Sequence, residues 1–269
     1  MIITAGIDVG AFTTKVIILD GDEKIRAKTL ARTGGDLARA SEEVYTQTLE
    51  QAGLGRKQVD YIVSTGFGRY LVPFRDIQVT DITSHARGIL HYFPHTRSVL
   101  DIGAQSTRAF KIEPNGRVKT FRLNDKCAAG AGAFLVRVAH YLEVPLEEMG
   151  PLSLQYQEPQ TISSVCAVLA ETEIINHISA GVRLEDILKG AMTAIADQSI
   201  VLLRRVGVEQ EVALSGGASK NIGVVKALEE RLGQRINCSS NGNEGSLFAG
   251  AMGAAILGQI RLPKLHKKL

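Results

Sequence analysis

Apolar runs along this 269-residue chain recur at two spacings, one that suits strands and one that suits helices. Near the N-terminus, apolar runs at 1–7 and 16–19 flank a polar turn, and runs at 97–100 and 109–112 flank a second one. A further turn-forming segment, DGDEK or EPNGR, follows each pair of runs. Two apolar runs joined by a short turn predict a β-hairpin in each place.

Longer blocks in the rest of the chain repeat apolar residues at helical spacing. The predicted helices span residues 36–53, 131–144, 168–181, 184–207, 221–233 and 244–260. Two more strands are predicted at 59–66 and 211–217, and the second ends in paired glycines. The last helix is rich in Gly and Ala, so we expect it to pack closely against other backbone. Strands that alternate with helices predict an α/β fold.

The two predicted hairpins share one residue pattern. Residues 8–15 read DVGAFTTK and residues 101–108 read DIGAQSTR, so an Asp begins each octet and a basic residue ends it. Because the flanking runs and the downstream turn recur as well, the pattern indicates two copies of one structural unit. We therefore expect a duplicated α/β architecture.

Composition is that of an ordinary globular protein, with 45% hydrophobic and 22% charged residues. No run approaches the roughly 18 apolar residues of a membrane-spanning helix, and the N-terminus lacks a signal-peptide pattern. We therefore expect a cytoplasmic protein that does not bind membranes. The net charge of +3 is too small and too evenly spread to indicate nucleic-acid binding. The basic tail at 261–269 is expected to be solvated.

Three cysteines, Cys127, Cys166 and Cys238, are an odd number for a chain expected in a reducing compartment. Disulfide bonds are therefore not expected, and a cysteine with a role would act as a thiolate in metal or redox chemistry. The sequence has no Cys-x-x-Cys spacing, and a cysteine beside alanines is commonly a small buried hydrophobic residue. From the residues alone, structural and metal-binding roles both stay open.

The Asp-x-Gly turns suit the binding of nucleotide phosphates. Glycine allows close approach of the backbone, whose N–H groups form an anion-binding nest, and hydroxyls with a basic side chain add donors. In the first hairpin the candidate phosphate-binding residues are Gly10, Ala11, Phe12, Thr13, Thr14 and Lys15. In the second hairpin they are Gly103, Ala104 and Ser106. Asp8 and Asp101 are candidates to hold Mg²⁺ through water, since that ion usually retains several waters.

A third element, SGGASKN at 215–221, closes a predicted strand with paired glycines before a predicted helix. Such a turn suits the adenine or ribose edge of a nucleotide. Its candidate contacts are Gly216, Gly217, Ala218 and Lys220. In order and spacing, the three elements resemble the ATPase core shared by actin, sugar kinases and Hsp70 chaperones. The resemblance implies ATP binding by a duplicated actin-like, ribonuclease H-like α/β fold with two lobes around a nucleotide cleft.

On that resemblance we expect an N-terminal lobe at 1–95, which carries the first hairpin and is completed by the C-terminal helix at 245–260. The C-terminal lobe at 96–244 is expected to carry the second hairpin, the cysteines at 127 and 166, and the adenosine element. The basic tail then ends the chain.

Two cysteine-containing segments carry a more specific resemblance. NDKCAAGAGAFL at 124–135 and SSVCAVLAETEII at 163–175 resemble the cysteine motifs of the activator ATPases of 2-hydroxyacyl-CoA dehydratases. That family includes the ATPase subunits of benzoyl-CoA reductase, and the resemblance extends over essentially the whole chain. It implies that Cys127 and Cys166 hold one [4Fe-4S] cluster between two identical subunits. It also implies that ATP drives delivery of an electron to a partner enzyme.

The residues themselves are compatible with such a cluster. A cubane cluster needs four thiolates, and a two-fold axis doubles two cysteines of one chain to four in a homodimer. Each of the two cysteines precedes a predicted helix, whose N-terminus favours an anionic ligand. Small residues after Cys127 leave room for the cluster and for the partner chain. A zinc site is the alternative use of four thiolates. Cys238 is expected to be structural.

The mechanism implied by the resemblance couples ATP hydrolysis to electron transfer. Asp8 and Asp101 would position Mg²⁺, one of them helping to orient the attacking water, and Gln105 is a candidate contact to the γ-phosphate or that water. Each lobe is expected to carry a helix that leads to the cluster, so that nucleotide state changes cluster geometry. A ferredoxin or flavodoxin would supply the electron. The acceptor would be an iron–sulfur enzyme such as a 2-hydroxyacyl-CoA dehydratase, benzoyl-CoA reductase or double-cubane cluster protein. An exposed cluster would be oxygen-sensitive, which implies an anaerobic host.

The chain departs from the family pattern at both hairpins. The activators typically have Asp-Ile-Gly-Gly-Gln-Asp in the second hairpin, where this chain has Ala104 for a glycine and Ser106 for an acidic residue. Phe12 stands where a small residue is usual. The segments DIGAQ and CAVLAETEIIN resemble the reductase-type ATPases more closely, or a relative that serves a double-cubane cluster protein. Reductase subunits often pair two similar chains, so a heterodimer is the alternative to a homodimer. A small-molecule kinase and a non-catalytic actin-like protein are the alternative functions.

Two further groups of titratable residues have no assigned role. His85, His91 and His95 are expected near a strand end, as structural residues rather than metal ligands. Glu171 and Glu173 lie shortly after Cys166, where they either cap a helix or contact the partner chain.

Overall fold

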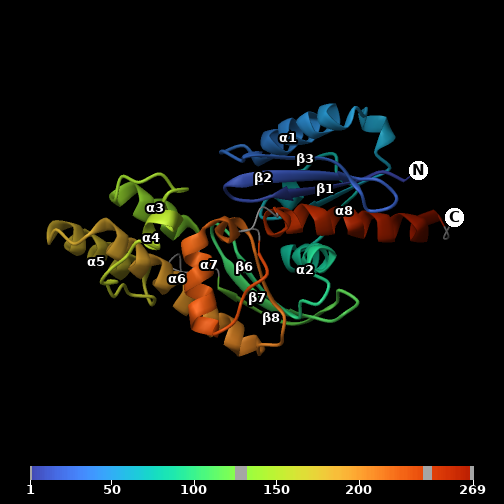
Figure 1. The fold of residues 1–269 in the computed structure, drawn as a ribbon. Coiled ribbons are helices and arrows are strands. Elements are labelled where there is room, and N and C mark those ends of the chain that lie inside the picture. Colours follow the sequence, from blue (N-terminus) through green and yellow to red (C-terminus); the bar gives the residue numbers. More distant parts are fainter. Residues whose placement is uncertain (1, 125–131, 239–243, 267–269) are drawn as a thin grey trace. The chain divides into compact units, whose positions relative to one another are not determined.

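The computed structural model describes residues 2–124, 132–238 and 244–266, so Cys127 and its neighbours lie outside the described residues. The chain divides into two compact units. Unit 1 comprises Met1–Pro94, Pro114–Val118 and Phe248–Leu269. Unit 2 comprises His95–Glu113 and Lys119–Leu247. Figure 1 labels the helices and strands of both units.

Unit 1 is built on a five-stranded sheet with the strand order β3-β2-β1-β4-β5. Its strands are β1 (Thr4–Val9), β2 (Thr13–Leu19), β3 (Ile25–Arg32), β4 (Tyr61–Thr65) and β5 (Ile77–Gln78). The strands β1, β2 and β3 pair antiparallel in succession, whereas β4 is parallel to β1 and β5 is parallel to β4. The first predicted hairpin is therefore present as β1 and β2.

Strand β1 is central in this sheet, and all six of its residues are buried. Successive side chains of a strand point to opposite faces of the sheet. Every second residue from Ala5 to Val9 packs with residues of α1 (Leu37–Ala52). On the other face, Gly6 lies so close to α8 (Gly245–His266) that a β-carbon would overlap the helix backbone. Asp8 belongs to this second face, because it is two residues beyond Gly6.

Helix α8 packs through small residues, as its Gly and Ala content predicted. Gly88 of α2 (Asp81–Tyr92) and Gly253 of α8 each lie where a β-carbon would overlap the backbone of the other helix. Within the described part of the chain, Gly245–Leu265 is the one helix long and apolar enough to span a membrane, but 78% of its apolar window is buried inside the protein. These contacts identify α8 as a core helix of unit 1.

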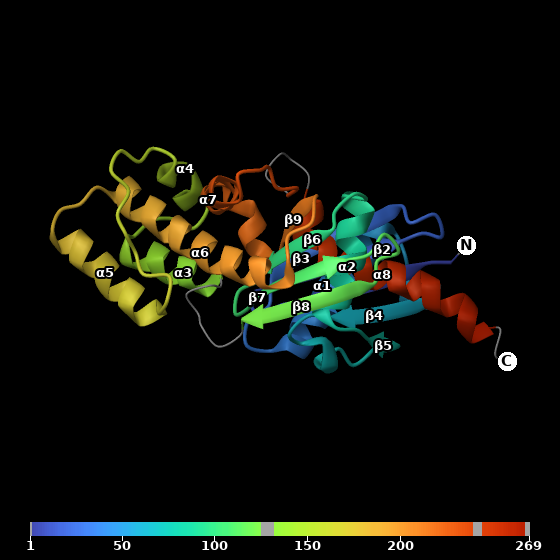
Figure 2. The same cartoon turned by 90° about the horizontal axis from the view of Figure 1, so that it is seen from below.

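Unit 2 contains a four-stranded sheet with the strand order β8-β7-β6-β9. Its strands are β6 (Ser98–Ile102), β7 (Thr107–Ile112), β8 (Val118–Asn124) and β9 (Val212–Ser215). Strand β6 pairs antiparallel with β7 and parallel with β9, and Figure 2 shows β7 and β8 side by side. The second predicted hairpin is therefore present as β6 and β7.

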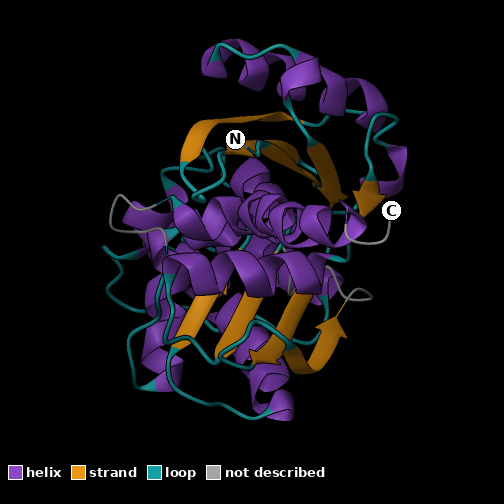
Figure 3. Cartoon of the chain, turned by 90° about the vertical axis from the view of Figure 1, so that its right-hand side faces the viewer, coloured by secondary structure: helices purple, strands orange, loops and turns teal. Residues whose placement is uncertain are grey.

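The α-helices of unit 2 pack around one long helix. Within the described residues they are α3 (Gly132–Tyr141), α4 (Met149–Ser153), α5 (Ala167–Ser179), α6 (Leu184–Val206) and α7 (Ile222–Leu232). Helix α6 is the central one, since 15 of its 23 residues are buried. Helix α5, by contrast, buries only Ala170 and Ile174. Figure 3 shows the helices in purple against the strands in orange.

The two sheets share one topology, because in both the third, second, first and fourth strands of the unit are neighbours in that order. This agrees with the duplication indicated by the repeated octets. The units differ in the connection after the third strand. In unit 1, α1 is the α-helix between β3 and β4, whereas α3, α4, α5 and α6 all lie between β8 and β9 in unit 2.

The larger connection of unit 2 carries both cysteine segments, since α3 follows Cys127 in the sequence and α5 follows Cys166. Both helices belong to unit 2. The expectation that each lobe carries a helix leading to the cluster stays a prediction.

Each predicted helix is present within a few residues of its expected limits, except that α8 extends further. Caps explain this agreement for α1 and α7. The side chains of Asp36 and Asn221 accept hydrogen bonds from the first helical turn, and Gly53 and Gly233 end the helices in the left-handed conformation.

The apolar pattern did not predict β3, β5, β8, α2 or α4. The histidines expected near a strand end include two on a helix, where His85 is buried within α2. That helix buries Ser84, Ala86 and Gly88, and small or polar residues give little apolar periodicity.

Tyr45 of α1 offers a test of the unit 1 core. Its side chain is fully buried, and its hydroxyl has no hydrogen-bond partner among the described residues. We expect Tyr45→Phe to raise the free energy of unfolding by about 1 kcal/mol at neutral pH, because it removes an unsatisfied buried hydroxyl. Urea denaturation measures the difference.

The same substitution tests an electrostatic effect. Burial raises the pKa of Tyr45 to about 12, because the phenolate would lose its hydration. The contribution of such a group to stability is fully present below the unfolded pKa, near 10, and is lost as the pH rises through about 12. Between those pH values the wild-type protein should lose about 2 kcal/mol more stability than Tyr45→Phe. An equal loss in both proteins would contradict the raised pKa.

Candidate functional site

Asp8 and Lys15 form a buried ion pair at the end of the first hairpin. The two residues lie opposite each other in the β1–β2 ladder, and Nζ of Lys15 is 3.3 Å from Oδ2 of Asp8. Both side chains are 8% exposed. Helix α8 approaches the carboxylate at Gly250, where a β-carbon would lie 2.9 Å from Oδ2 of Asp8 and 2.8 Å from Nε2 of His85. Glycine at this position therefore leaves the space that the carboxylate occupies.

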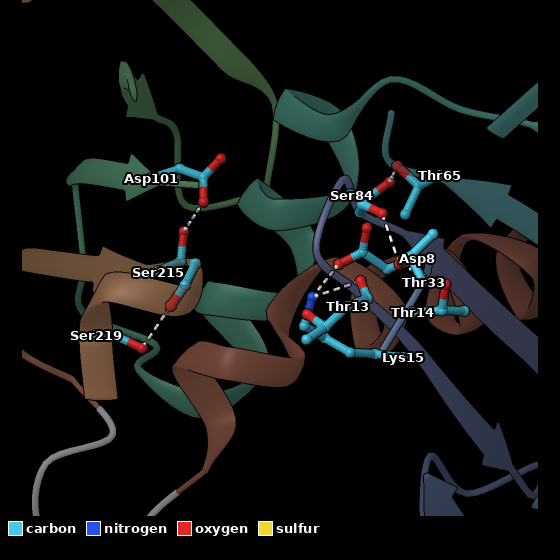
Figure 4. A network of polar contacts seen from close by, with 12 residues as sticks. Asp8, Thr13, Thr14, Lys15, Thr33, Thr65, Ser84, Asp101, Ser215 and Ser219 are labelled. Carbon is cyan, nitrogen blue, oxygen red and sulfur yellow. Dashed lines mark hydrogen bonds and ion pairs between the residues drawn. The ribbon is translucent and has the colours of Figure 1, made fainter. Parts of the chain in front are cut away.

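The turn between β1 and β2 is held by Thr33, which follows β3. The Thr33 amide donates to the carbonyl oxygen of Phe12 at 2.9 Å, and its hydroxyl donates to that of Gly10 at 2.8 Å. The same hydroxyl lies 3.0 Å from the hydroxyl of Thr14. Within the turn, the Gly10 amide donates to the carbonyl of Thr13 at 3.1 Å. These residues surround a fixed turn (Figure 4), at whose tip Phe12 is 43% exposed.

The second hairpin repeats this arrangement in unit 2. Asp101 lies opposite Arg108 in the β6–β7 ladder, and Nη1 of Arg108 donates to Oδ2 of Asp101 at 2.6 Å. The other carboxylate oxygen, Oδ1, accepts a hydrogen bond from the hydroxyl of Ser215 at 3.1 Å (Figure 4). The Gly103 amide donates to the carbonyl of Ser106 at 3.0 Å, which is the counterpart of the bond in the first turn.

A glycine backbone packs against each aspartate. Strands β4 and β9 end beside Asp8 and Asp101, and the next residues, Gly66 and Gly216, have φ angles of +90° and +85°. A β-carbon would lie 2.5 Å from Oδ1 of Asp8 at Gly66, and 2.7 Å from Oδ1 of Asp101 at Gly216. Glycine is required in both places, because it combines this φ with the necessary clearance. The predicted SGGASKN element thus has a counterpart in unit 1, the segment STGFGRY, which the sequence analysis missed.

The remaining candidate adenosine contacts lie in the short helix Gly217–Lys220. Gly217 and Lys220 are exposed, whereas Ala218 is buried. The Ser219 hydroxyl donates to the carbonyl of Gly216 at 2.7 Å and closes this turn.

The turns of the two hairpins, at 10–13 and 103–106, are here called the phosphate-type turns. The residue at the tip of each turn is more exposed than the residues beside it. Gln105 is exposed at the tip of the second turn, with Ala104 and Ser106 half-buried on either side. Ala11 and Thr13 are half-buried in the first turn. The backbone of each turn is therefore partly accessible.

The second turn is hydrogen-bonded to the beginning of α3. The amides of Gly132 and Ala133 donate to the carbonyls of Gly103 and Ala104, each at 2.8 Å. Amides in the first turn of a helix have no acceptor within the helix. Gly132 packs so closely that a β-carbon would lie 3.2 Å from the carbonyl oxygen of Gly103. Helix α3 is therefore anchored on the turn.

Cys166 is the N-cap residue of α5, in agreement with its predicted place before a helix. The backbone before it is fixed at two points. The Ser163 amide donates to Oε2 of Glu173 at 2.6 Å, and the Ser164 carbonyl accepts from Nε2 of Gln198 at 3.0 Å. The half-buried cysteine side chain makes no capping hydrogen bond within the described residues. The amides of the first helical turn are thus suited to an anionic ligand.

Of the other two cysteines, the structure describes Cys238 alone. Cys127 lies outside the described residues, so its role as a cluster ligand stays a prediction. Cys238 follows Asn237, which bridges to Ala213 of β9, and it packs half-buried against the unit 2 core. The described part of the chain contains no group of three or more His, Cys, Asp or Glu side chains placed to hold a metal ion. With three cysteines in the sequence, a four-thiolate cluster would require a second chain.

The hairpins are suited to an anion and, indirectly, to a divalent cation. Each turn presents backbone amides beside a basic side chain, Lys15 or Arg108. Each aspartate already has an oxygen bound to that side chain, and Asp101 also accepts from Ser215. Direct metal coordination would compete with these partners, whereas the remaining lone pairs can accept hydrogen bonds from metal-bound water. The residues therefore fit Mg²⁺ held through water.

Three residues identified only from the structure hold the turns and the cysteine segment in place. Thr33, Ser215 and Gln198 lie outside the repeated octets, and their contacts join segments far apart in the chain. A hydroxyl residue followed by glycine at the end of a predicted strand, Thr65-Gly66 and Ser215-Gly216, was the available sequence signal for Gly66.

Residues 5–258 match the model of the BadF/BadG/BcrA/BcrD ATPase family. A component of benzoyl-CoA reductase from Thauera aromatica is 38% identical to this chain, over 99% of this chain and 96% of the relative. The solved structure of the activator of 2-hydroxyisocaproyl-CoA dehydratase from Clostridium difficile with bound ADPNP has a TM-score of 0.91 at 34% identity, over 100% of this chain and 98% of that one. The structure of (R)-2-hydroxyglutaryl-CoA dehydratase component A from Acidaminococcus fermentans has a TM-score of 0.91 at 35% identity, over 98% of this chain and 100% of that one.

More distant structures share the fold alone. A ROK-family glucokinase from Streptomyces griseus in complex with glucose and AMPPNP has a TM-score of 0.60 at 14% identity, over 96% of this chain and 99% of that one. Together with the family match and the topology of the two sheets, this likeness confirms the predicted actin-like α/β fold.

Gly216 and Gly217 offer a matched test of the contact between backbone and carboxylate. A β-carbon at Gly216 would lie 2.4 Å from the carbonyl oxygen of Ile102, whereas nothing lies within 4 Å of one at Gly217. We expect Gly216→Ala to lower the free energy of unfolding by about 2 kcal/mol or more, from backbone strain and overlap. Gly217→Ala should stay within about 0.5 kcal/mol of wild type. Urea denaturation followed by circular dichroism measures both, and equal stability of the two variants would contradict the close contact.

Proposed function

This chain belongs to the BadF/BadG/BcrA/BcrD ATPase family, and on that premise we propose that it is the ATP-hydrolysing electron donor of an iron–sulfur enzyme. In this proposal a [4Fe-4S] cluster bridges two copies of the chain, and ATP hydrolysis drives an electron from the cluster to the acceptor. The observation that carries the proposal is the position of Cys166 at the start of α5. That helix lies in the same unit as the phosphate-type turn on which α3 is anchored.

The two units are proposed to be the two lobes of the ATPase, and each hairpin contributes one set of phosphate contacts. The turn at 10–15 offers amides, hydroxyls and Lys15, and the turn at 103–106 offers amides and the Ser106 hydroxyl. The exposed residues Gly217 and Lys220, with Gly216 and Ala218 shaping the turn, are proposed to contact the adenosine. The solved relative with bound ADPNP supports nucleotide binding by a chain of this fold.

Asp8 and Asp101 are proposed to hold Mg²⁺ through water, and one of them helps to orient the attacking water. Bound there, the ion would neutralise charge on the phosphates during hydrolysis. The basic partners of the two carboxylates fix them in direction. Gln105 is exposed at the tip of its turn, which suits a contact to the γ-phosphate or the attacking water.

The exposed apolar side of α5 supports a dimer around the cluster. Side chains there and just before the helix are exposed although they are apolar, with exposures between 39% and 80%: Val165, Val168, Leu169, Ile175 and Ile178. A helix that is apolar on both sides is typically covered on both. A two-fold axis beside Cys166 would cover this surface with its own copy and bring four thiolates together. A heterodimer with a similar chain would cover it in the same way.

The relatives point to the class of acceptor. They include activators of 2-hydroxyacyl-CoA dehydratases and a component of benzoyl-CoA reductase. We propose an iron–sulfur acceptor of that kind, or a double-cubane cluster protein, for this chain. A ferredoxin or flavodoxin serves as donor, in the cytoplasm of an anaerobic organism. Lowering a one-electron potential by about 200 mV takes about 4.7 kcal/mol, which is the scale of work that the nucleotide cycle must deliver.

A small-molecule kinase or a non-catalytic actin-like protein would have the same fold. Neither would give a role to Cys166 at the start of α5 or to the exposed apolar side of that helix. The iron-dependent electron donor accounts for both features.

Purification without oxygen tests the cluster. The wild-type protein should be brown, with absorbance near about 400 nm that dithionite bleaches and about two iron atoms per chain, because one four-iron cluster is shared by two chains. Cys166→Ser should lose the iron and retain ATP binding, since Cys166 lies outside both hairpins. Iron analysis and absorption spectroscopy measure the loss.

Cys238→Ser is the matched control, because that cysteine packs against the core, and it should retain the iron. Full iron content in Cys166→Ser would exclude Cys166 as a ligand. If the wild-type protein contains no iron and still hydrolyses ATP, the proposed cluster is refuted and only the ATPase activity remains.

Asp8→Asn tests the hydrolytic site. It removes the negative charge that is proposed to hold Mg²⁺, so we expect kcat for ATP hydrolysis to fall by about 100-fold or more. Phosphate release at saturating MgATP measures the rate, and circular dichroism verifies folding. Asp36→Asn is the control, because asparagine caps a helix as well as aspartate does, and it should hydrolyse ATP normally. A wild-type rate in Asp8→Asn would remove Asp8 from the site.

A further inference from the structure

Unit 2 joins its phosphate-type turn to Cys166 by a continuous series of hydrogen bonds. We infer that Glu171 is the positioning residue through which nucleotide binding at the turn changes the surroundings of Cys166. The inference rests on the proposed function of the turn and of the cysteine. It adds a specific route between them and a residue on which that route depends.

The first step joins the turn to α3. The amides of Gly132 and Ala133 donate to the carbonyls of Gly103 and Ala104, so the contact is made by backbone on both sides. Side-chain rotation cannot absorb a displacement of the turn at such a contact. A ligand that moves or stiffens the turn therefore acts on α3 as a whole.

The second step joins α3 to α5 through one carboxylate. Nε of Arg137 donates to Oε1 of Glu171, and the hydroxyl of Tyr141 donates to Oε2 at 3.1 Å. Arg137 and Tyr141 are four residues apart and therefore share one face of α3. The hydrogen bond to Glu171 raises the pKa of Tyr141, as expected when a tyrosine donates to an ionised carboxylate. Figures 1 and 2 show α3 and α5 side by side.

The third step joins α5 to the cysteine. Glu171 lies in the first turns of the helix that Cys166 begins, and the Ala170 amide donates to the Cys166 carbonyl at 3.0 Å. Glu173 of the same helix holds the amide of Ser163, so the segment before the cysteine is tied to α5 as well. The Ser164 carbonyl is held by Gln198 of α6, so movement of α5 relative to α6 changes the surroundings of the Cys166 thiol.

This resolves the role of the two glutamates after Cys166. Glu171 binds α3 and Glu173 braces the loop before its own helix, so within unit 2 both have partners in their own chain. The side chain of Glu171 is 19% exposed, and both of its oxygens are hydrogen-bonded. Replacing it removes the polar link between α3 and α5 while the apolar contacts of the two helices with the unit 2 core stay.

The test measures the reactivity of Cys166 in the full-length chain after removal of iron. Iodoacetamide labelling of Cys166 is followed by peptide mass spectrometry, with and without ADPNP and Mg²⁺. In the wild-type protein we expect nucleotide to change the labelling rate by on the order of 5-fold. In Glu171→Gln the change should fall below about 2-fold, with an unaltered dissociation constant for ADPNP. The double variant Arg137→Glu/Glu171→Arg should recover part of the response, because it restores opposite charges on the two helices.

Glu230→Gln is the matched control. Both oxygens of Glu230 of α7 are hydrogen-bonded, like those of Glu171, but here by one residue of a neighbouring helix, since Nζ of Lys189 lies 2.8 and 2.6 Å from them. It should retain the wild-type response. A loss of response in this control as well would overturn the inference, because the effect would then be general destabilisation.

The remaining outcomes separate this inference from the proposed function. A full nucleotide response in Glu171→Gln would overturn the inference, and so would wild-type protein that binds ADPNP with no change at Cys166. Failure to bind ADPNP at all would refute the proposed function and the inference with it. Absence of iron after oxygen-free purification would refute the cluster alone, because the labelling is measured on iron-free protein.

Discussion

A carboxylate held at the end of a buried strand is the constraint on which each unit of this protein depends. A buried charge is costly unless a partner and hydrogen bonds compensate it. Asp8 and Asp101 meet this requirement with a basic residue directly opposite in the hairpin ladder, Lys15 or Arg108. The spacing of the octets follows from this pairing, because a tight hairpin brings its first and eighth residues together. Glycine backbone after the neighbouring strand leaves the space in which the carboxylate sits.

Both units contain this paired carboxylate, but they differ in the connection after the third strand, which is much longer in unit 2. That connection places α3, α4, α5 and α6 between β8 and β9, and it contains both Cys127 and Cys166. The duplicated core is suited to nucleotide phosphates, and the added helices follow the two cysteines that are proposed to hold the cluster. Because α3 begins on the turn of the second hairpin, the two specialised parts are in direct contact within one unit. The electron-donor function proposed for the chain draws on this arrangement.

Local patterns predicted the parts of the structure that local physics decides. The hairpins, the limits of α1 and α7, and the position of Cys166 before a helix follow from apolar runs, turn residues and caps. Helix α2 was missed because its buried face uses small residues, which fit against α8 but give no apolar periodicity. Thr33 was missed for a related reason, since its three contacts to the first turn depend on β3 lying beside β2.

The sequence by itself determined the family, the duplicated core and the residue types at each turn. These features depend on short motifs, whose residues interact with near neighbours in the chain. Only the tertiary structure decided which residues hold those motifs in place. It alone revealed that Glu171 binds α3 and that Gly66 repeats the role of Gly216. Such contacts join segments far apart in the chain, and their geometry depends on how strands pair and helices pack rather than on the identity of neighbouring residues.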